Sequence, residues 1–309
     1  MRRNFCTMIL ALLIALALPM AALSEEADAG ETVYVENAMN FVDGSMDVSA
    51  GIPENAEGVL ADIRDRGVLR VATEPYYPPQ EFIDPSREGQ EQYVGADMEL
   101  ARAIAKAMGV ELEIVPMEFT EVLTAVDEER CDLAISALAF TPGRAAAAEL
   151  SKGYYFADER AGGALLIRAA DVGTIAGAGD LAGRDIVAQS GSLQELLMAR
   201  NVMDYHEFRR LSTQQEVYDA VSSGEADAAM VDVEPAQGYI ANNPDSGLAL
   251  LLDQRYTLEE EYDGDRVAGR KGEFQLMYFV NGVIDGLLAE GLYRAWFEEY
   301  AALAAELGM

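Results

Sequence analysis

The sequence predicts an α/β protein with two lobes, each a mainly parallel sheet flanked by helices, joined by a two-strand hinge. Short apolar runs typical of buried strands alternate with helical segments from Val68 onward, and the alternation is repeated from Asp185. This rhythm favours parallel strands with helices on their faces. Two polar stretches, at about 157–163 and 259–269, separate the halves, so we expect the chain to cross twice between the lobes.

The composition supports two modest domains. The chain has 309 residues, of which 50% are hydrophobic and 25% charged, which is enough to bury proper cores. Its formal net charge of −32 argues against nucleic acid or an anionic membrane surface as a partner. The acidity indicates solubility, with at most a bias toward cationic ligands.

Residues 1–24 have the pattern of a secretory signal peptide. Arg2 and Arg3 precede an apolar run, and small residues follow it up to Ser24, where we expect cleavage. An uncleaved anchor is the alternative. Cys6 lies before the apolar run, so it is not the lipid-carrying cysteine of a lipoprotein. Only Cys131 remains after processing, which excludes an intramolecular disulfide. We therefore expect an extracytoplasmic protein.

The first half contains the elements of one lobe. Residues 25–58 are acidic and weakly periodic, which predicts a flexible spacer or a docking segment. Three prolines keep Thr73–Pro79 out of a helix, and this loop projects two tyrosines. The other predicted elements are a helix at Val59–Arg66, a strand at Val68–Ala72, a helix ending near Met108, a strand at Glu111–Val115, a helix at Thr120–Glu128 and a strand at Leu133–Leu138.

The second half repeats the pattern. Its predicted elements are a strand at Asp185–Gln189, a helix at Leu193–Arg200, a strand at Glu207–Arg209, a helix at Thr213–Ser222, a strand at Ala226–Val231, a helix after Pro235 and a strand at Leu248–Leu252. Two last helices, Phe274–Leu288 and Tyr293–Leu307, are expected to return to the first lobe. The predicted lobes are 59–157 with 266–309, and 162–260, with the hinge near 158–161 and 261–265.

Arg144 stands where helix electrostatics disfavour a cation. Thr141 and Pro142 are typical of an N-cap and a first helical residue, which puts Arg144 in the first turn. A guanidinium there opposes the helix macrodipole by up to about 1 kcal/mol. A bound anion would make the position of the Arg144 guanidinium favourable instead. The planar guanidinium also presents several donors side by side, which suits a carboxylate. The alternative is that an acidic residue of the chain pairs with Arg144.

Polar and aromatic residues follow the predicted strands, where ligands bind in open parallel sheets. Glu74 and Tyr77 follow the first strand, Phe119 follows the second, and Arg144 lies beyond the third. Asp232 follows a strand of the second half. Across a cleft, Arg144 and Asp232 would match the carboxylate and ammonium of a zwitterion, between apolar walls.

Each of these residues also has a purely structural alternative. Tyr77 would then cover the edge of a core, and Asp232 would cap the following helix. Ser192 and Glu195 fit a capping box. Gly191 allows close backbone approach, so the amides that follow it would also suit an anion.

Four stretches of the chain form a recognisable set when taken in order. They are Leu69–Thr73 with Tyr77–Pro79, Tyr93–Ala101, Asp132–Arg144 and Ser190–Ser192. In this order and spacing they resemble the extracytoplasmic solute-binding proteins of polar amino-acid ABC transporters, over about Leu60–Glu299. The resemblance implies the two-lobed periplasmic-binding-protein fold of type II. It also implies that the lobes close on one amino acid and that a membrane permease recognises the closed form.

The resemblance assigns roles by position. Arg144 would bind the α-carboxylate and Asp232 the α-ammonium, while Tyr77 and Phe119 would sandwich the side chain. Glu74 matches a position that meets a basic side chain in some members. The complete predicted set of ligand-binding residues is Glu74, Tyr77, Phe119, Ser136, Ala137, Ala139, Thr141, Arg144, Ser190, Ser192, Leu193 and Asp232. Ala137, Ala139, Leu193 and Gln80 depart from the residues frequent in the family, so side-chain donors are fewer here.

The predicted function is therefore binding of an amino acid, cationic if Glu74 takes part, and its delivery to an ABC permease. We expect a monomer that is not an enzyme, with no cofactor, no metal and no nucleic-acid partner. One alternative is a cyclohexadienyl dehydratase on the same fold, with Glu195 or Glu74 as the acid. A sensory binding module without transport is the other.

Overall fold

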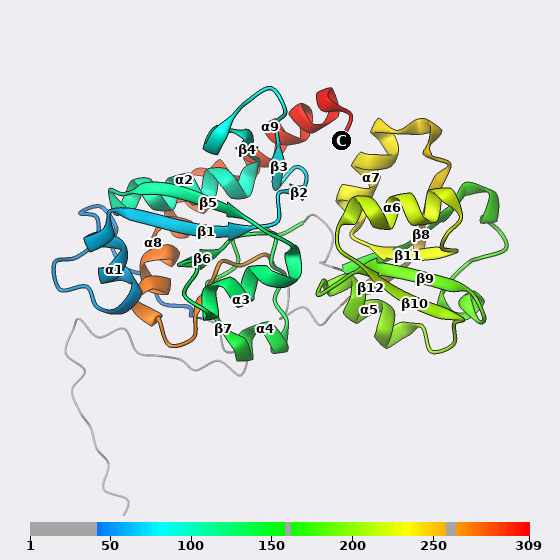
Figure 1. The fold of residues 1–309 in the computed structure, drawn as a ribbon, viewed down its shortest axis with the longest axis horizontal. Coiled ribbons are helices and arrows are strands. Elements are labelled where there is room, and N and C mark those ends of the chain that lie inside the picture. Colours follow the sequence, from blue (N-terminus) through cyan, green and yellow to red (C-terminus); the bar gives the residue numbers. More distant parts are fainter. Residues whose placement is uncertain (1–41, 158–161, 258–263) are drawn as a thin grey trace, which may run out of the picture. The chain divides into compact units, whose positions relative to one another are not determined.

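The computed structural model describes residues 42–157, 162–257 and 264–309 (Figure 1). The expected signal peptide, residues 25–41 of the acidic segment and the expected hinge positions 158–161 and 261–263 lie outside these ranges. No helix within the three ranges is long and apolar enough to cross a membrane.

The first sheet has five strands in the order β5-β1-β6-β13-β7. They are β1 (Val68–Thr73), β5 (Glu111–Pro116), β6 (Leu133–Ala134), β7 (Ala148–Leu150) and β13 (Ala268–Arg270). β1 pairs in parallel with β5 and β6, whereas β13 pairs antiparallel with β6 and β7. The sheet therefore has a parallel half, which the strand–helix rhythm predicts, and an antiparallel half formed by two short strands that were not predicted.

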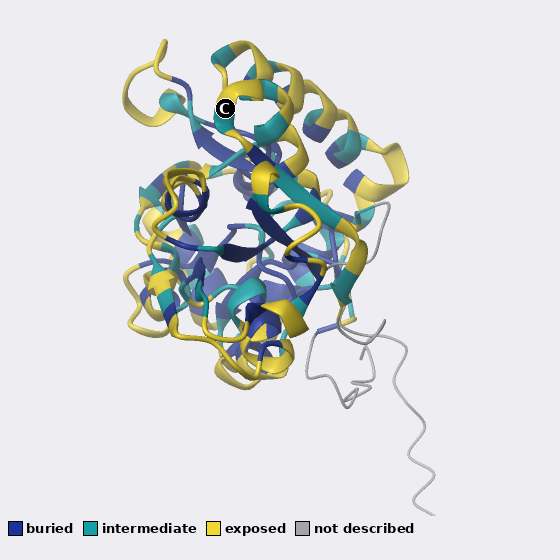
Figure 2. Cartoon of the chain, turned by 90° about the vertical axis from the view of Figure 1, so that its right-hand side faces the viewer, coloured by how far each residue is buried: buried dark blue, intermediate teal, exposed yellow. Residues whose placement is uncertain are grey.

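Alternating residues of β1 face two separate cores. Leu69 and Val71 pack into a core shared with α1 (Gly58–Arg66), α2 (Ala96–Met108) and α8 (Phe274–Glu290). Ala72 faces the opposite core, with α3 (Val122–Asp127) and α4 (Pro142–Ala147). Figure 2 shows the central strands in dark blue and much of the helix and loop surface in yellow, whereas an edge strand such as β5 is only partly buried. This is the burial pattern that a sheet covered on both faces requires.

The second sheet repeats this plan with the order β10-β9-β11-β8-β12. Its strands are β8 (Gly162–Arg168), β9 (Asp185–Gln189), β10 (Glu207–Leu211), β11 (Ala228–Val231) and β12 (Leu248–Thr257). β9 pairs in parallel with β10 and β11, and β8 pairs antiparallel with β11 and β12. Leu165 and Ile167 face α5 (Leu193–Asn201), while Leu166 faces α6 (Gln214–Ser223) and α7 (Val233–Asn242).

The bounds of several predicted elements differ in the structure. The strand expected at Leu133–Leu138 ends at Ala134, because Ala137 has a φ of 46°, which no strand accommodates. The helix expected at Thr120–Glu128 is shorter and follows a 3₁₀ turn. α7 begins at Val233, before Pro235, because a proline is tolerated in the first turn. The strand expected to end at Leu252 continues to Thr257.

The described part of the acidic segment lies along α8. The Val42 amide donates to the Leu150 carbonyl at 2.8 Å, and the side-chain amide of Asn281 donates to the carbonyls of Val42 and Gly44. Residues 42–58 are therefore docked, and the flexible-spacer alternative is wrong for them. The last helix, α9 (Leu292–Leu307), packs against α2 and α8.

A small sheet positions the loop after β1. It consists of β2 (Tyr76–Tyr77), β3 (Glu81–Ile83) and β4 (Tyr93–Val94). Gly95, at a φ of 123°, lets this sheet approach α2, because an added Cβ would lie 2.2 Å from the Gln80 carbonyl oxygen. The Asp97 amide then donates to that carbonyl at 2.8 Å. The loop that bears Tyr77 is thus fixed to the start of α2.

Candidate ligand-binding site

The loops at the carboxyl ends of β1, β6, β9 and β11 converge on one small cavity. Its volume is about 50 Å³, so a whole amino acid is accommodated only if the surrounding groups move apart. The cavity is lined by Glu74, Tyr77, Gln80, Glu81, Phe119, Ser136, Ala137, Ala139, Arg144, Gln189, Ser192, Leu193, Gln194, Asp232 and Asp265.

Ten of the twelve predicted residues line this cavity, and Thr141 and Ser190 do not. Thr141 caps α4, because its hydroxyl oxygen accepts from the Arg144 amide at 3.1 Å. The Ser190 amide donates to the Leu211 carbonyl at 2.8 Å and is therefore not free for a ligand. The expectation that ligands bind at the carboxyl ends of the strands locates the site. It does not distinguish residues that stabilise a loop from residues that line the cavity.

Arg144 is buried at the cavity wall without an acidic partner. Its exposure is 8%, and its guanidinium donates to the carbonyls of Ala139 at 2.7 Å and Gly191 at 3.0 Å. It also lies 5.4 Å from the ring centre of Phe119. No carboxylate in the described part of the chain forms an ion pair with it. Burial lowers the pKa of Arg144 to about 10, and the Asp265 carboxylate offsets this effect only in part.

Asp232 stands at the start of α7 and faces Tyr77. Its side chain makes no capping hydrogen bond with good geometry, although the amides of Val233 and Glu234 lie close enough to lower its pKa. Burial is the larger effect and raises the pKa of Asp232 to about 6, which the Tyr77 hydroxyl partly offsets. The carboxylate is thus only weakly satisfied by the chain.

Glu74 forms a second acidic end of the cavity. It is 1% exposed, and the Gln189 side-chain amide approaches its carboxylate at 3.4 Å while also donating to the Ser212 carbonyl at 3.1 Å. Burial raises the pKa of Glu74 to about 8. A cation placed here would restore the ionised form.

Asp97 holds the loop after β6 in its strained shape. Its carboxylate accepts from the Ala137 amide at 2.8 Å and from the hydroxyls of Tyr154 at 2.8 Å and Tyr293 at 2.6 Å. The left-handed conformation of Ala137 is unfavourable for a residue with a Cβ, so the loop needs such an anchor.

Glu81 is a second buried acid beside this network. The Ser136 hydroxyl donates to one of its oxygens at 3.0 Å, and the other oxygen finds no donor among the described groups. Burial raises the pKa of Glu81 well above its usual range, and the neighbouring Asp97 carboxylate adds to this shift. Burial also raises the pKa of Asp97, but the hydroxyl and amide donors around Asp97 partly offset that effect, so a proton is favoured more strongly on Glu81 than on Asp97.

Five cavity residues were not predicted: Gln80, Glu81, Gln189, Gln194 and Asp265. Gln189 is the last residue of β9. The prediction considered only residues that follow a strand, so it would have included Gln189 if it had also considered the last residue of each strand. Asp265 follows no predicted strand and lies in the second crossing between the lobes. Its side chain reaches the cavity because its backbone pairs with Ala139 and Tyr155, which the sequence does not indicate. Among the described residues, four carboxyl groups and one guanidinium thus line the cavity. No cluster suited to a metal ion occurs among the residues in the described ranges.

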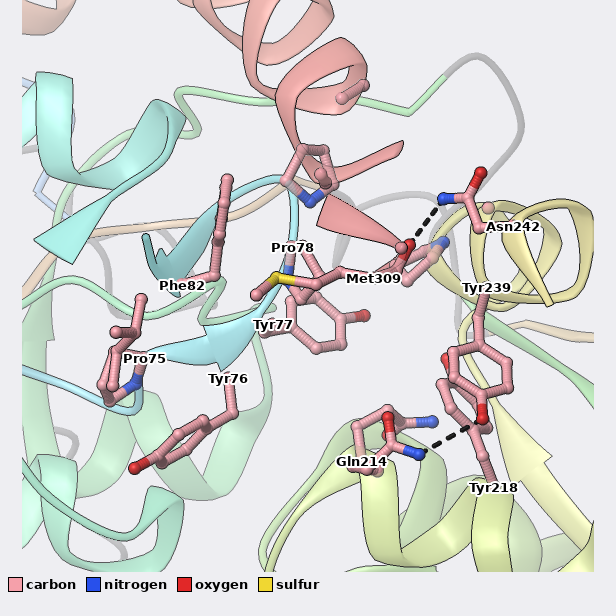
Figure 3. Close-up of a pocket in the computed structure, with 18 of the residues that line it drawn as sticks. Pro75, Tyr76, Tyr77, Pro78, Phe82, Gln214, Tyr218, Tyr239, Asn242 and Met309 are labelled. Carbon is pink, nitrogen blue, oxygen red and sulfur yellow. Dashed lines mark hydrogen bonds between the residues drawn. The ribbon is translucent and has the colours of Figure 1, made fainter. Parts of the chain in front are cut away.

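A larger cavity of about 660 Å³ lies beside Tyr77, on the side of α9 (Figure 3). Its lining is mainly prolines, aromatic residues and Met309, and Glu234 is its one charged side chain in the described part. The hydroxyl of Tyr155 donates to Glu234 at 2.7 Å. We place the candidate site in the smaller cavity, because recognition groups of both signs converge only there.

Comparison with known proteins gives a consistent picture. A family model described as bacterial extracellular solute-binding proteins, family 3, matches residues 69–302. The L-cystine-binding protein TcyJ of Escherichia coli is 26% identical over 245 residues, which are 79% of this chain and 86% of TcyJ.

Two solved structures share the fold. One is the amino acid ABC transporter substrate-binding protein AbpA of Streptococcus pneumoniae bound to L-arginine, at 32% identity and a TM-score of 0.69, covering 78% of this chain and 98% of that one. The other is an ancestral amino-acid-binding protein described as a precursor of cyclohexadienyl dehydratase. It has 25% identity and a TM-score of 0.66, and covers 79% of this chain and 99% of that one.

Proposed function

Because this chain belongs to the bacterial extracellular solute-binding proteins of family 3, we propose that it binds an amino acid outside the cytoplasm and delivers it to an ABC transporter. The observation that carries the proposal is Arg144, a buried guanidinium on the cavity wall with no ion-pair partner among the described residues. A ligand carboxylate supplies that partner. Asp232, from the other lobe, supplies the acceptor for the ammonium group.

We propose a cationic amino acid as the ligand. Four carboxyl groups line the cavity against one guanidinium, so a ligand with two cationic centres and one carboxylate reduces the excess of negative charge. Glu74 and Gln189 at the far end would receive the basic side chain. Among the similar proteins, AbpA was solved with L-arginine bound, and TcyJ is described as an L-cystine-binding protein.

Closure follows from contacts that only both lobes together provide. Arg144 belongs to α4 of the first lobe, and Asp232 follows β11 of the second. A ligand that touches both therefore binds the closed state more tightly and shifts the equilibrium toward it. We propose 59–157 with 266–309, and 162–260, as the two moving bodies, residues 1–24 as the export signal, and a monomer that binds no nucleic acid.

Calorimetric titration with L-arginine of the protein and its Arg144→Ala variant tests this function. The variant is expected to lose at least about 100-fold in affinity, because a charge-assisted contact is worth about 3 kcal/mol. Its melting temperature without ligand should change little, since the substitution removes an unpaired buried charge. Arg130→Ala is the matched control, because Arg130 lies on the surface beside Glu128. Unchanged binding by Arg144→Ala would overturn the assignment.

A dehydratase is the second candidate, supported by Glu74, whose raised pKa of about 8 keeps a proton available at neutral pH. The other candidate acid, Glu195, is occupied. Its carboxylate accepts from the Gly191 amide at 2.8 Å and pairs with Arg210 at 2.9 Å, outside the cavity lining. Incubation with prephenate or arogenate, followed by absorbance of the aromatic product, separates the two functions. Turnover that Glu74→Gln abolishes would favour the enzyme.

A further inference from the structure

Asp265 is an acidic cavity residue whose position is fixed from two sides. It forms bridges with Ala139 and Tyr155, with its amide donating to the Tyr155 carbonyl at 2.9 Å and its carbonyl accepting from the Tyr154 amide at 2.9 Å. Its carboxylate accepts from the side-chain amide of Gln80 at 2.8 Å. The backbone thus holds this carboxylate beneath the loop that carries Ala139 and leads to Arg144.

The groups that face Asp265 include two carboxylates, one cation and four phenols. Asp97 on α2 and Asp232 before α7 are the acids, and Arg144 on α4 is the cation. The phenols, which are neutral at ordinary pH, are Tyr77, Tyr154, Tyr155 and Tyr293. Negative charge therefore exceeds positive charge around it.

Arg144 attracts the Asp265 carboxylate but compensates its charge only in part. No ion pair joins them among the described residues, and the guanidinium donates instead to the carbonyls of Ala139 and Gly191. Gln80 supplies one neutral donor, which is not enough for a buried carboxylate. Without ligand, the remaining way to avoid an uncompensated charge is to hold a proton.

We propose that Asp265 acts with Asp232 as a second carboxylate for the ammonium group of the ligand, and that binding displaces a proton from this pair. The proposal rests on the proposed function of amino-acid binding. The proton leaves a carboxyl oxygen for solvent as the ammonium group takes its place, and no other bond changes. Asp265 is then a further ligand-binding residue, because a ligand without an ammonium group displaces no proton.

Two pKa values support this exchange. Burial raises the pKa of Asp265 to about 8 and that of Asp232 to about 6, so at pH 7 the empty pair holds about one proton. An ammonium group between the two carboxylates lowers both values. The loaded protein therefore binds fewer protons, and affinity rises with pH from about 6 to 8.

Calorimetry in two buffers of different ionisation enthalpy at pH 7 counts the protons released when L-arginine binds. The protein and Asp253→Asn, which removes an exposed carboxylate from β12, should release the same number. Asp265→Asn should bind more weakly and release about one proton fewer per ligand. Between pH 6 and 7.5, the affinity of the parent protein should rise with pH more steeply than that of Asp265→Asn. The difference between the two slopes should be about tenfold in affinity per pH unit.

Equal proton release by Asp265→Asn and the parent protein, with binding heat present in both, would overturn the proposal while leaving amino-acid binding intact. Absence of binding heat from the parent protein with arginine, lysine, histidine and cystine would instead overturn the proposed function, and this inference with it. A ¹³C titration of the carboxyl groups of the parent protein covers the case that Asp265→Asn does not fold. An aspartate carboxyl titrating above pH 7 in the empty protein and below pH 6 with L-arginine is expected, and the absence of such an aspartate contradicts the proposal.

Discussion

Ala137 and Asp97 show how one residue sets the shape of the candidate site. Ala137 has a left-handed backbone that costs about 1 kcal/mol for a residue with a Cβ. Asp97 stabilises it by accepting the Ala137 amide together with two buried tyrosine hydroxyls. The cavity loop thus depends on a carboxylate on α2 that does not itself line the cavity.

Replacing Asp97 with alanine should therefore weaken both fold and binding. We expect the free energy of unfolding to fall by about 3 kcal/mol or more, because three buried donors lose their acceptor. Urea denaturation measures this loss, and the affinity for L-arginine should fall as well. Asp127→Ala, an exposed change at the end of α3, should cost less than about 0.5 kcal/mol. A loss as small as this in Asp97→Ala would contradict the anchoring role.

At the residue scale, the sequence identifies groups that follow strands and misses groups that arrive from elsewhere. Arg144, Asp232, Tyr77 and Glu74 were predicted because each lies beyond a predicted strand, and the cavity brings them together. Asp265 could not be predicted this way, because its direction depends on pairing with Ala139. Their roles as ligand contacts remain predictions.

At the scale of elements, caps define where helices begin. α6 begins with a complete capping box, in which the Thr213 hydroxyl accepts from the Glu216 amide at 3.2 Å and the Glu216 carboxylate accepts from the Thr213 amide at 3.1 Å. This helix carries Val217 and Val221 into the core of the second sheet. The two reciprocal bonds satisfy donors that the first turn would otherwise leave open.

Thr213→Ala should lower the free energy of unfolding by about 1 kcal/mol, because the alanine cannot accept from the first turn. Thr174→Ala, at an exposed loop position, is the matched control and should change stability by less than about 0.5 kcal/mol. Thermal or urea unfolding of both variants makes the comparison. An equal effect in the two would mean that the box contributes nothing.

The sequence predicts helices better than the short strands of this fold. The predicted α2, α5, α6, α8 and α9 occur with ends shifted by one or two residues, because their apolar period and caps are local signals. β7 and β13 were missed because three residues carry no period, and β13 contains a glycine. Such strands form because the sheet offers them partners, which is a property of the tertiary structure.

At the scale of the whole molecule, the protein buries several carboxyl groups although its net charge is already strongly negative. The chain carries a formal charge of −32, and four carboxyl groups line one small cavity. The two-lobed fold was predicted from the repeated strand–helix rhythm and is confirmed by the related structures. Two of the cavity acids, Glu74 and Asp232, were predicted, whereas Glu81 and Asp265 were not, because composition does not say which of 54 acids point inward.

The stability of the ligand-free protein should therefore fall as pH rises. The folded state raises the pKa of Glu74 and Asp265 to about 8 and that of Asp232 to about 6, so it binds more protons than the unfolded chain above about pH 4. This stabilisation is complete below about pH 4 and is lost as pH rises through 6 to 8. Glu74 alone accounts for on the order of 5 kcal/mol.

Differential scanning calorimetry without ligand should accordingly give a lower melting temperature at pH 8.5 than at pH 5. Saturating L-arginine should reduce the difference, because its cationic groups compensate the ionised carboxylates. A melting temperature that rises over this range in the empty protein would contradict the raised pKa values.

Because Cys131 is buried, a dye could be attached selectively to a cysteine introduced on the surface of the protein. Cys131 is 2% exposed in the core beneath α3, and burial raises the pKa of its thiol to about 11, so almost no thiolate is present at neutral pH. The only other cysteine of the sequence, Cys6, lies within residues 1–24. A cysteine introduced at exposed Thr120, whose methyl group faces Gly191, would then be the single site that a maleimide dye labels in a chain without that leader. The dye emission would report directly on the loop that Arg144 touches.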